Sequence, residues 1–267
     1  MDLQLGGKLA LITGASKGIG RATALTLAAE GCSVFLAARS GDELETLRKE
    51  ILSQHPVKVD LHPGDLSTTE SMVALASAAG DVNILVNNAG DVPAGTVEAL
   101  SDDEWRRGFD LKVFGYINLT RAIYGRMKQR GSGVIVNDIG NSGENWDYNY
   151  VAGSTANAAL MSFTKAVGGV SLDYGVRVVG VNPGPIATDR MVRIMKRRAR
   201  DHFGDESRWQ VYLSDYPGGR MGTAQEVADL IAFLASPRAG YITGTIVTVD
   251  GGIAAYGSVI KPRPKRQ

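Results

Sequence analysis

Three glycines near the amino terminus have the spacing of an anion-binding turn. Residues 13–20 read T-G-A-S-K-G-I-G and lie between a short apolar run and a segment of helix-forming composition. Gly14 can adopt backbone angles closed to other residues, and Gly18 and Gly20 carry no side chain to hold a ligand away from the helix start. Unpaired N–H groups and the positive end of the helix dipole attract an anion there. The segment predicts a pyrophosphate site, and an ordinary tight turn is the alternative.

Two cations near this turn favour a particular nucleotide. Arg39 ends the apolar run at 33–38, which is typical of the second strand of a βαβ unit, and Lys17 lies within the glycine turn. In such a unit the second strand ends beside the adenosine ribose, where an acidic residue binds a free 2′-hydroxyl and an arginine suits a 2′-phosphate. The pair therefore favours NADP(H) over NAD(H), and two solvated surface charges are the alternative.

The composition indicates one domain, and its nearly neutral net charge means that a specific binding site, and not overall charge, determines what it binds. The 267 residues are 44% apolar and carry a net charge of +1, so nothing favours nucleic acid or an anionic membrane as partner. The single cysteine, Cys32, excludes an internal disulfide, and the histidines show no metal-ligand spacing. With neither a signal peptide nor an apolar run near 18 residues, we expect a cytoplasmic protein that acts on a small molecule.

Strand and helix patterns alternate along the chain, as in a parallel sheet covered by helices. The strand-like runs lie at 9–12, 33–38, 57–61, 84–86, 134–136 and 176–181. The helical patterns lie at 21–30, 42–53, 70–79, 102–130, 156–174 and 225–235. No internal repeat or interdomain linker divides them, so the elements predict a single α/β domain.

Further motifs, taken with the glycine turn, resemble the short-chain dehydrogenase/reductase family. They are N-N-A-G at 87–90, N-P-G-P-I-A-T at 182–188 and Y-I-T-G-T-I-V-T-V-D-G-G at 241–252. The resemblance implies a Rossmann-type, doubly wound, mostly parallel seven-stranded sheet and NAD(P)(H)-dependent oxidoreduction of a carbonyl or alcohol. It implies one domain at 1–253 with a variable substrate lid at about 189–217, and a tail at 254–267 whose last residues look disordered.

The same resemblance implies which residues bind the cofactor and how copies associate. The cofactor residues are Gly14, Ser16, Lys17, Gly18, Ile19, Gly20, Arg39, Asp65, Leu66, Asn88, Ala89, Gly90, Asn157, Pro183, Gly184, Ile186 and Thr188. Asp65 has a plain turn aspartate as its alternative interpretation. The family also implies a homo-oligomer, a tetramer or dimer, built through the helices that contain Lys112 and Asn157.

The family's catalytic tetrad of Asn, Ser, Tyr and Lys falls on other residue types here. Aligning A-A-L-M-S-F-T-K at 158–165 with the family's usual sequence places Gly153 at the tyrosine and Asn157 at the lysine. Gly140 then stands at the serine, and Lys112 stands at the asparagine. In the family the tyrosine gives a proton to the substrate oxygen and the lysine lowers the tyrosine's pKa. The cofactor motifs are present, but the usual acid is not.

Relocation of the catalytic groups is the hypothesis we favour. Lys112 supplies its ammonium from the other helix, and Tyr150 leans into the space above Gly153 and donates the proton. Ser142 replaces the serine. Tyr148 is an alternative donor, Ser154 and Asn141 are further polar candidates, and the plain interpretation of both tyrosines is as aromatic pocket walls.

A protein without turnover and an enzyme without redox chemistry are the alternatives to relocation. The chain can be an NADP(H)-binding pseudoenzyme that acts as sensor or scaffold, a view to which Gly153 within a helix lends weight. It can also be a non-redox enzyme on the same scaffold, but the glycine turn and Arg39 argue against this. On the substrate side, the lid carries a basic run from Arg193 to Arg200. That run suits an acidic or coenzyme A-linked substrate, or is a solvated face.

Overall fold

All strands of the central sheet run in one direction and end at the same edge. In the computed structural model, which describes residues 1–256, seven strands pair in parallel in the order β3-β2-β1-β4-β5-β6-β7. The strands are β1 Leu9–Thr13, β2 Ser33–Ala38, β3 Val59–Pro63, β4 Ile84–Asn87, β5 Gly133–Asp138, β6 Val176–Pro183 and β7 Ile246–Val249. The order reverses between β1 and β4, and in such sheets ligands bind outside the carboxyl ends of the strands at this point. The predicted doubly wound sheet is confirmed.

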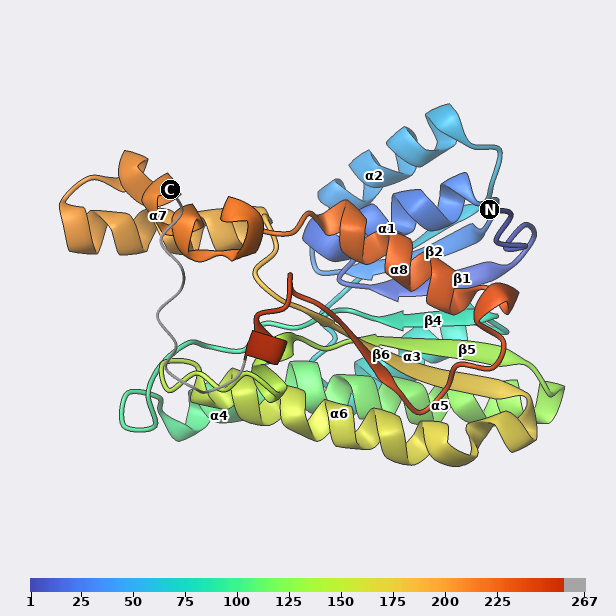
Figure 1. Cartoon of the computed structure of the whole chain (residues 1–267). Coiled ribbons are helices and arrows are strands. Elements are labelled where there is room, and N and C mark those ends of the chain that lie inside the picture. The colour runs from blue at the N-terminus through green and yellow to red at the C-terminus, as the bar shows by residue number, and fades with distance from the viewer. Residues whose placement is uncertain (257–267) are drawn as a thin grey trace.

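Helices cover both faces of the sheet (Figure 1). On one side lie α1 Gly18–Ala29, α2 Gly41–Gln54 and α8 Ala224–Ala235, and on the other lie α3 Thr69–Ala79, α5 Gly115–Arg130 and α6 Val151–Ser171. Strand side chains alternate between the two layers: Val34 and Leu36 join the α1 side, while Phe35 and Ala37 join the α3 side. This two-sided burial explains why the strands form continuous apolar runs and not alternating ones.

The long helix predicted at 102–130 is interrupted. It consists of α4 Asp102–Phe109, a π-helical turn at Asp110–Phe114, and α5. Single π-helical turns inside α-helices often occur at functional sites, because they redirect side chains. Lys112 lies in this turn.

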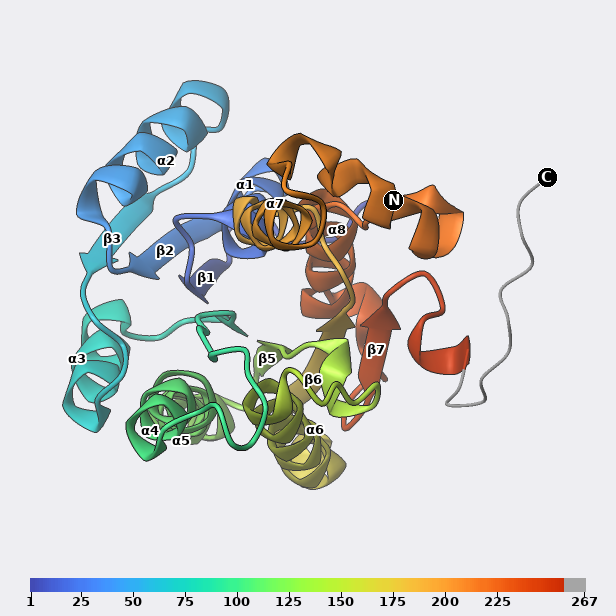
Figure 2. The same ribbon diagram turned by 90° about the vertical axis from the view of Figure 1, so that its left-hand side faces the viewer.

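The predicted lid forms a separate layer beyond the carboxyl edge of the sheet. Helix α7, Asp189–Phe203, projects past the strand ends, and a 3₁₀ segment at Glu206–Asp215 packs beside it (Figures 1 and 2). Only Met195 and Ala199 of α7 are buried, so the basic side chains of this helix are largely exposed. The lid therefore rests on the domain through few apolar contacts.

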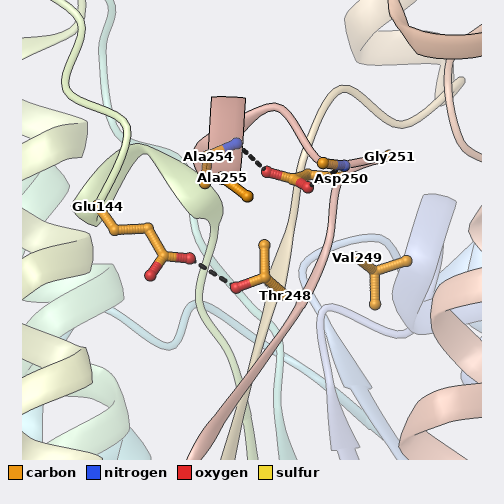
Figure 3. Close-up of a pocket in the computed structure, with 8 residues that line it drawn as sticks. Glu144, Thr248, Val249, Asp250, Gly251, Ala254 and Ala255 are labelled. Carbon is orange, nitrogen blue, oxygen red and sulfur yellow. Dashed lines mark hydrogen bonds between the residues drawn. The ribbon is translucent and has the colours of Figure 1, made fainter. Parts of the chain in front are cut away.

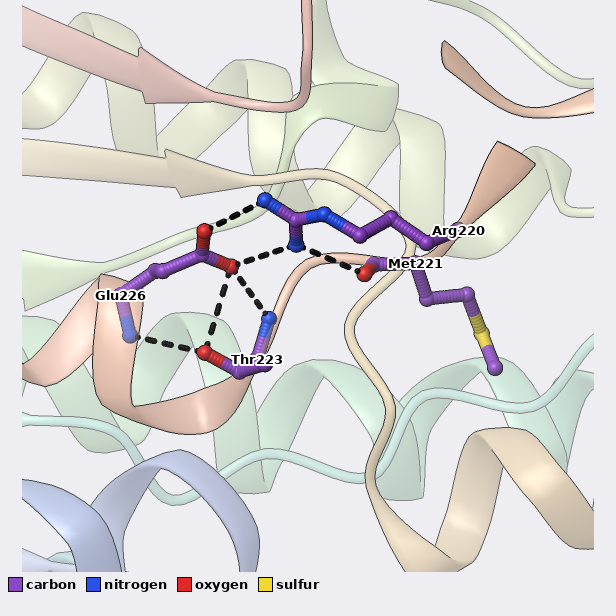
Figure 4. Close-up of polar contacts among 4 residues, drawn as sticks. All are labelled: Arg220, Met221, Thr223 and Glu226. Atoms are coloured by element: carbon purple, nitrogen blue, oxygen red, sulfur yellow. Dashed lines mark hydrogen bonds and ion pairs between the residues drawn. The ribbon is translucent and has the colours of Figure 1, made fainter. Parts of the chain in front are cut away.

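The start of α8 is fixed by a network of charged hydrogen bonds (Figure 4). Thr223 and Glu226 form a capping box, and Arg220 donates to both Glu226 carboxylate oxygens at 2.9 and 2.7 Å. The bidentate pair lowers the pKa of Glu226 to about 2. Gly222, inside this clamp, accepts a hydrogen bond from Ala187 N at 2.8 Å. The clamp thereby holds the segment after β6 against the start of α8.

Most of the tail predicted at 254–267 lies outside the described residues. Residues 254–256 form a short 3₁₀ turn. In residues 1–256, no helix combines the length and apolarity that a membrane crossing requires.

Arg177 provides a test of how β6 is tied to the end of α8. Its buried guanidinium donates to the carbonyls of Leu234 at 2.7 Å and Ser236 at 2.9 Å, and burial lowers its pKa to about 10. Arg177→Met removes the donor to the Leu234 carbonyl and one of two donors to the Ser236 carbonyl, which also accepts from Ala239 N at 3.1 Å. The free energy of unfolding should therefore fall by about 2–4 kcal/mol in urea titrations. Arg238→Met, at an exposed position nearby, should change it by less than about 0.5 kcal/mol. Equal losses in the two variants would show that these buried bonds do not stabilise the fold.

Candidate functional site

The glycine turn after β1 forms a cradle that side chains would fill. Gly14 and Gly18 have φ values of +65° and +55°, and a Cβ on Gly20 would overlap the Gly14 carbonyl oxygen. The Asn88 amide closes the turn by donating to Thr13 O at 2.8 Å and Gly14 O at 3.2 Å. This geometry requires glycine at all three positions.

The start of α1 leaves its amide groups free for a ligand. Its N-cap residue, Lys17, makes no side-chain capping bond, whereas Ser40, Thr68 and Thr223 cap α2, α3 and α8 with their hydroxyls. The first turn of a helix has unpaired N–H groups that need an acceptor. A bound pyrophosphate would satisfy them, so the open N-terminus and the cradle fit this group.

The other residues implied for the cofactor gather at the same edge. Thr188, the N-cap of α7, lies against Gly18, because a Cβ there would be 3.1 Å from the Thr188 methyl carbon. Asn88, Ala89 and Gly90 follow β4 directly, Pro183 ends β6 and is followed by Gly184, and Ser16 and Ile19 belong to the glycine turn and the start of α1. Ile186 is buried in the core beside them.

The adenosine side is less complete than the pyrophosphate side. Arg39 follows β2, is exposed, and has no ion pair or hydrogen bond with any residue of the described chain. Lys17 instead pairs with Glu43 at 2.6 Å, which lowers the pKa of that carboxyl. Asp65 is exposed and accepts from Ser67 N at 3.2 Å, as a turn aspartate does, while Leu66 beside it is buried. Arg39 is therefore the cation available to a 2′-phosphate.

Asn157 and Ser142 are brought together at the centre of the edge. The Asn157 amide donates to Ser142 Oγ at 2.8 Å, and a Cβ on Gly140 would lie 2.7 Å from the same nitrogen. Gly140 also has φ +132°, so the serine of the family pattern cannot stand there without strain. Asn157 Oδ1 is buried without a hydrogen-bond partner in the described chain. Such an atom needs a donor, and a cofactor ribose hydroxyl at this position would supply one.

Tyr150 occupies the space that Gly153 leaves open. Helix α6 begins at Val151, so Tyr150 is its N-cap and does not extend the helix as the relocation hypothesis required. Even so, a Cβ on Gly153 would overlap ring atoms Cε1 and Cζ of Tyr150. The ring packs with Val92, Trp105 and other apolar side chains, and this burial raises the pKa of its phenol. The aromatic ring therefore stands where a side chain at position 153 would begin.

Lys112 points into the protein and meets a buried carboxylate. Its Nζ donates to Ile139 O at 2.6 Å, and its aliphatic chain passes Gly90, where a Cβ would be 2.8 Å from Lys112 Cδ. Burial lowers the pKa of Lys112 to about 8 and raises that of Asp138 to about 7, while the opposite charge of each group resists the other's shift. Within residues 1–256 no hydrogen bond joins the ammonium to the Tyr150 hydroxyl.

Two other polar candidates have structural partners of their own. Ser154 Oγ accepts from the Asp147 backbone N–H at 3.3 Å, and this bond holds the loop before α6. The Tyr148 side chain is 62% exposed, and its hydroxyl donates to the Glu98 carboxylate at 3.2 Å. Ser154 and Tyr148 therefore bond to the loops around the site and do not lie at its centre.

Asn141 bonds to a residue that lines a hollow of about 480 Å³ at the carboxyl end of β7, Asp250 (Figure 3). Its amide donates to Asp250 Oδ2 at 3.1 Å. Nearby, Glu144 Oε1 accepts from Thr248 Oγ1 at 2.6 Å and from Asn182 Nδ2 at 3.1 Å. These bonds tie the loop between β5 and α6 to the end of β7, so Asn141 has the role of a brace.

Sequence reasoning missed Asp138 and Arg190. Asp138 ends the buried strand β5 directly after Asn137, and a carboxylate at the end of a buried strand is a signal that could have identified it. Arg190 ion-pairs with Asp91 at 3.2 Å and donates to Val92 O at 3.2 Å. Nothing in the sequence separates it from the other arginines of the lid.

The lid and the segment after β4 enclose a basic hollow of about 760 Å³. Arg190, Arg197, Arg198 and His202 line it, with Asp201 as the acidic group among its lining residues. Ile194 adds an apolar wall. The hollow lies on the same side as Tyr150, because Arg190 reaches both.

Comparisons with known proteins relate the chain to reductases over nearly its whole length. A family model described as enoyl-(acyl carrier protein) reductase matches residues 14–254. The 3-oxoacyl-[acyl-carrier-protein] reductase of Escherichia coli is 36% identical over 251 residues, covering 92% of this chain and 97% of that protein. The NADPH-dependent reductase BacG of Bacillus subtilis is 32% identical over 251 residues, with the same shares of the two chains.

A solved structure shows the same architecture at similar identity. L-Sorbose reductase from Gluconobacter frateurii, complexed with NADPH and L-sorbose, superposes with a TM-score of 0.90 at 31% identity. The match covers 95% of this chain and 99% of that one.

The buried Asp138 should make stability depend on pH. Its pKa is about 7 in the folded protein against 3.8 for the free group, so its stabilising effect is complete below about pH 4 and is lost as pH rises through 7. Asp138→Asn removes this loss. In urea titrations, the stability of the variant relative to wild type should increase by about 1–3 kcal/mol between pH 5 and pH 8. A difference that does not change with pH would mean that Asp138 is ionised throughout.

Proposed function

This chain belongs to the short-chain dehydrogenase/reductase family, and we propose that it is an NADP(H)-dependent oxidoreductase of a carbonyl or alcohol whose proton donor has moved to Tyr150. The observation that carries the proposal is the Tyr150 ring in the space above Gly153. The proposal thus combines a nucleotide cradle with a phenol ring beside the position where a side chain at residue 153 would begin.

The chain's own residues can hold the cofactor at three points. The open start of α1 and the glycine turn receive the pyrophosphate, Arg39 receives the 2′-phosphate, and Asn157 Oδ1 accepts from a ribose hydroxyl. When bound, NADPH supplies the hydride. The choice of NADP(H) is supported by the unpaired Arg39 and by the relatives, since BacG is named for NADPH and the L-sorbose reductase structure contains it.

Tyr150 and Ser142 divide the work on the substrate oxygen. Ser142 Oγ accepts from Asn157, so its own hydrogen is free to donate to a carbonyl oxygen and orient it. The Tyr150 hydroxyl gives its proton to that oxygen as negative charge develops there. Asn157 and Gly153 are about one helical turn apart on α6, so Ser142, which bonds Asn157, and Tyr150, which packs over Gly153, approach the same face of this helix.

Lys112 and Asp138 form a proton store beside the site. Their pKa values, about 8 and about 7, are close enough for either group to change its protonation near neutral pH. Lys112 also fixes the end of β5 through Ile139 O. In this proposal the Lys112 ammonium holds the end of β5 in place, and it can release a proton and take one up again near neutral pH.

A nucleotide-binding pseudoenzyme is the second candidate function, and one observation favours it. Burial raises the pKa of Tyr150, and Lys112 donates to a backbone carbonyl and not to the phenol. A weak acid of this kind suits a sensor or scaffold better than a fast catalyst. Both the pseudoenzyme and the oxidoreductase would bind NADPH without substrate, but only the oxidoreductase would transfer hydride.

Copies of the chain are proposed to associate through the helices α5 and α6. Phe114, just before α5, is 51% exposed, and Val170 on α6 is 58% exposed. Apolar side chains at these places suit burial against another copy. On the substrate side, the arginines of the basic hollow suit an acidic or coenzyme A-linked substrate.

Arg39 should set the preference between the two nicotinamide cofactors. Arg39→Ala should weaken NADPH binding about tenfold to a hundredfold and leave NADH binding unchanged, because a charge-assisted contact to the 2′-phosphate is lost. Isothermal titration calorimetry measures both affinities. Arg48→Ala, on the same side of the protein and paired with Glu45, is the matched control and should change neither. An equal effect of Arg39→Ala on both cofactors would assign this arginine a structural role.

Tyr150→Phe should lower turnover by about 10²–10⁴ while NADPH affinity stays within a few-fold, because the variant loses only the proton donor. Lys112→Ala should likewise abolish turnover. NADPH oxidation across a broad carbonyl panel measures this, with Tyr148→Phe as the control that keeps its activity. Activity surviving in Tyr150→Phe would remove Tyr150 from the mechanism. Wild-type protein that binds NADPH but reduces no carbonyl and oxidises no alcohol would be the pseudoenzyme.

A further inference from the structure

Tyr150 is held in place by the segment that follows β4. Gly95 forms an isolated parallel bridge with Tyr150, and Val151 N donates to Gly95 O at 3.4 Å. Val92, from the same segment, is 1% exposed and belongs to the apolar cluster on which the Tyr150 ring packs. The position of the phenol therefore depends on residues 91–95 as much as on α6.

Arg190 joins α7 to the same segment. Its Nη2 lies 3.2 Å from Asp91 Oδ1 and donates to Val92 O at 3.2 Å. Because Val92 belongs to the apolar cluster on which Tyr150 packs, these two contacts fix the guanidinium at the edge of that cluster. The positive charge of Arg190 lowers the pKa of the Tyr150 phenol. Arg190 thus reaches the place from the first turn of the lid.

Two charged side chains, joined to each other by an ion pair, shift the pKa of the Tyr150 phenol in opposite directions. Burial raises the pKa of Tyr150, Arg190 of α7 lowers it, and Asp91 after β4 raises it. The cluster on which the ring packs is apolar and includes Val113 of the π-helical turn and Ala152 of α6, and Trp105 of α4 packs against the same cluster.

We propose that Arg190 is the positioning residue that gives Tyr150 its neighbouring positive charge, in the role that a lysine on α6 has in the family pattern. This inference rests on the proposed function, since it concerns the residue assigned there as proton donor. The acid is then assembled from three segments: the start of α6 carries the phenol, the segment after β4 holds it, and the lid brings the cation.

Proton transfer from a tyrosine beside an arginine differs from proton transfer from a tyrosine beside a lysine. The O–H bond of Tyr150 breaks, the proton goes to the carbonyl oxygen of the substrate, and the hydride comes from NADPH. The phenolate that remains is stabilised by the guanidinium until solvent returns a proton. An arginine stays charged throughout the working pH range, whereas an ammonium can lose its proton. Asp91 holds the guanidinium and offsets part of its charge.

The test measures the pKa of Tyr150 itself in the cofactor-free protein. A fluorinated tyrosine at position 150 has a more acidic phenol and a ¹⁹F signal, so its titration can be followed while the protein stays folded. Arg190→Met should raise the measured pKa by about 1, and Arg190→Lys should restore most of the shift. Arg193→Met, which removes an exposed charge from the same helix, should leave the pKa unchanged.

A second variant separates electrostatics from structural damage. Asp91→Asn removes the carboxylate but keeps the shape of the side chain, so it should lower the pKa of the same phenol. Shifts of opposite sign in Arg190→Met and Asp91→Asn support the proposal. A shift in the same direction in both variants, or none in Arg190→Met, overturns it. This titration does not measure turnover. If Tyr150→Phe remained active, the proposed function would be wrong, and the titration would still show whether Arg190 shifts the pKa of Tyr150.

Discussion

The structure around the candidate site follows from one constraint, which is that α6 carries glycine at position 153 and only the short asparagine side chain at position 157. Protein interiors are close-packed, and a void of the size of a tyrosine ring would cost several kcal/mol. The space above Gly153 is instead filled by Tyr150 from the turn before the helix, and the space beside Asn157 is shared with Ser142. Gly140 is the counterpart of this repacking, because the Asn157 amide lies where its side chain would be.

Two ionisable side chains, Lys112 and Asp138, lie inside the protein next to this region. Lys112 and Asp138 are both removed from most contact with water, and neither is joined to the other by a direct ion pair in the described residues. Burying such groups is unfavourable unless each has a partner, and here the Ile139 carbonyl supplies one for the ammonium while Asp138 Oδ1 has none within residues 1–256. A partly satisfied pair of this kind is common at sites where proteins keep ionisable groups for use and not for stability.

Much of the fold and of the nucleotide cradle could be predicted from the sequence, because both depend on local rules. Apolar runs and glycines at fixed spacing determine strand, turn and helix, and the later motifs fix the positions of Lys112 and Asn157 along the chain. The partners of those residues could not be predicted. Asp138 and Arg190 reach the site through tertiary packing of β5 and α7, and the break of the long helix at 110–114 leaves no clear mark in its periodicity.

The π-helical turn at 110–114 sets the angular register of everything after it. A turn closed by i→i+5 hydrogen bonds contains one residue more than a turn of α-helix, so the side chains that follow are rotated by about 100° relative to an unbroken helix. Phe109 faces the Tyr150 cluster, whereas Leu119 faces the sheet. Deleting one residue here would let α4 and α5 merge into a continuous rod and turn one half of it away from its neighbours. The orientation of α4 relative to α5 therefore depends on the presence of one additional residue in the turn at 110–114, more than on which amino acid that residue is.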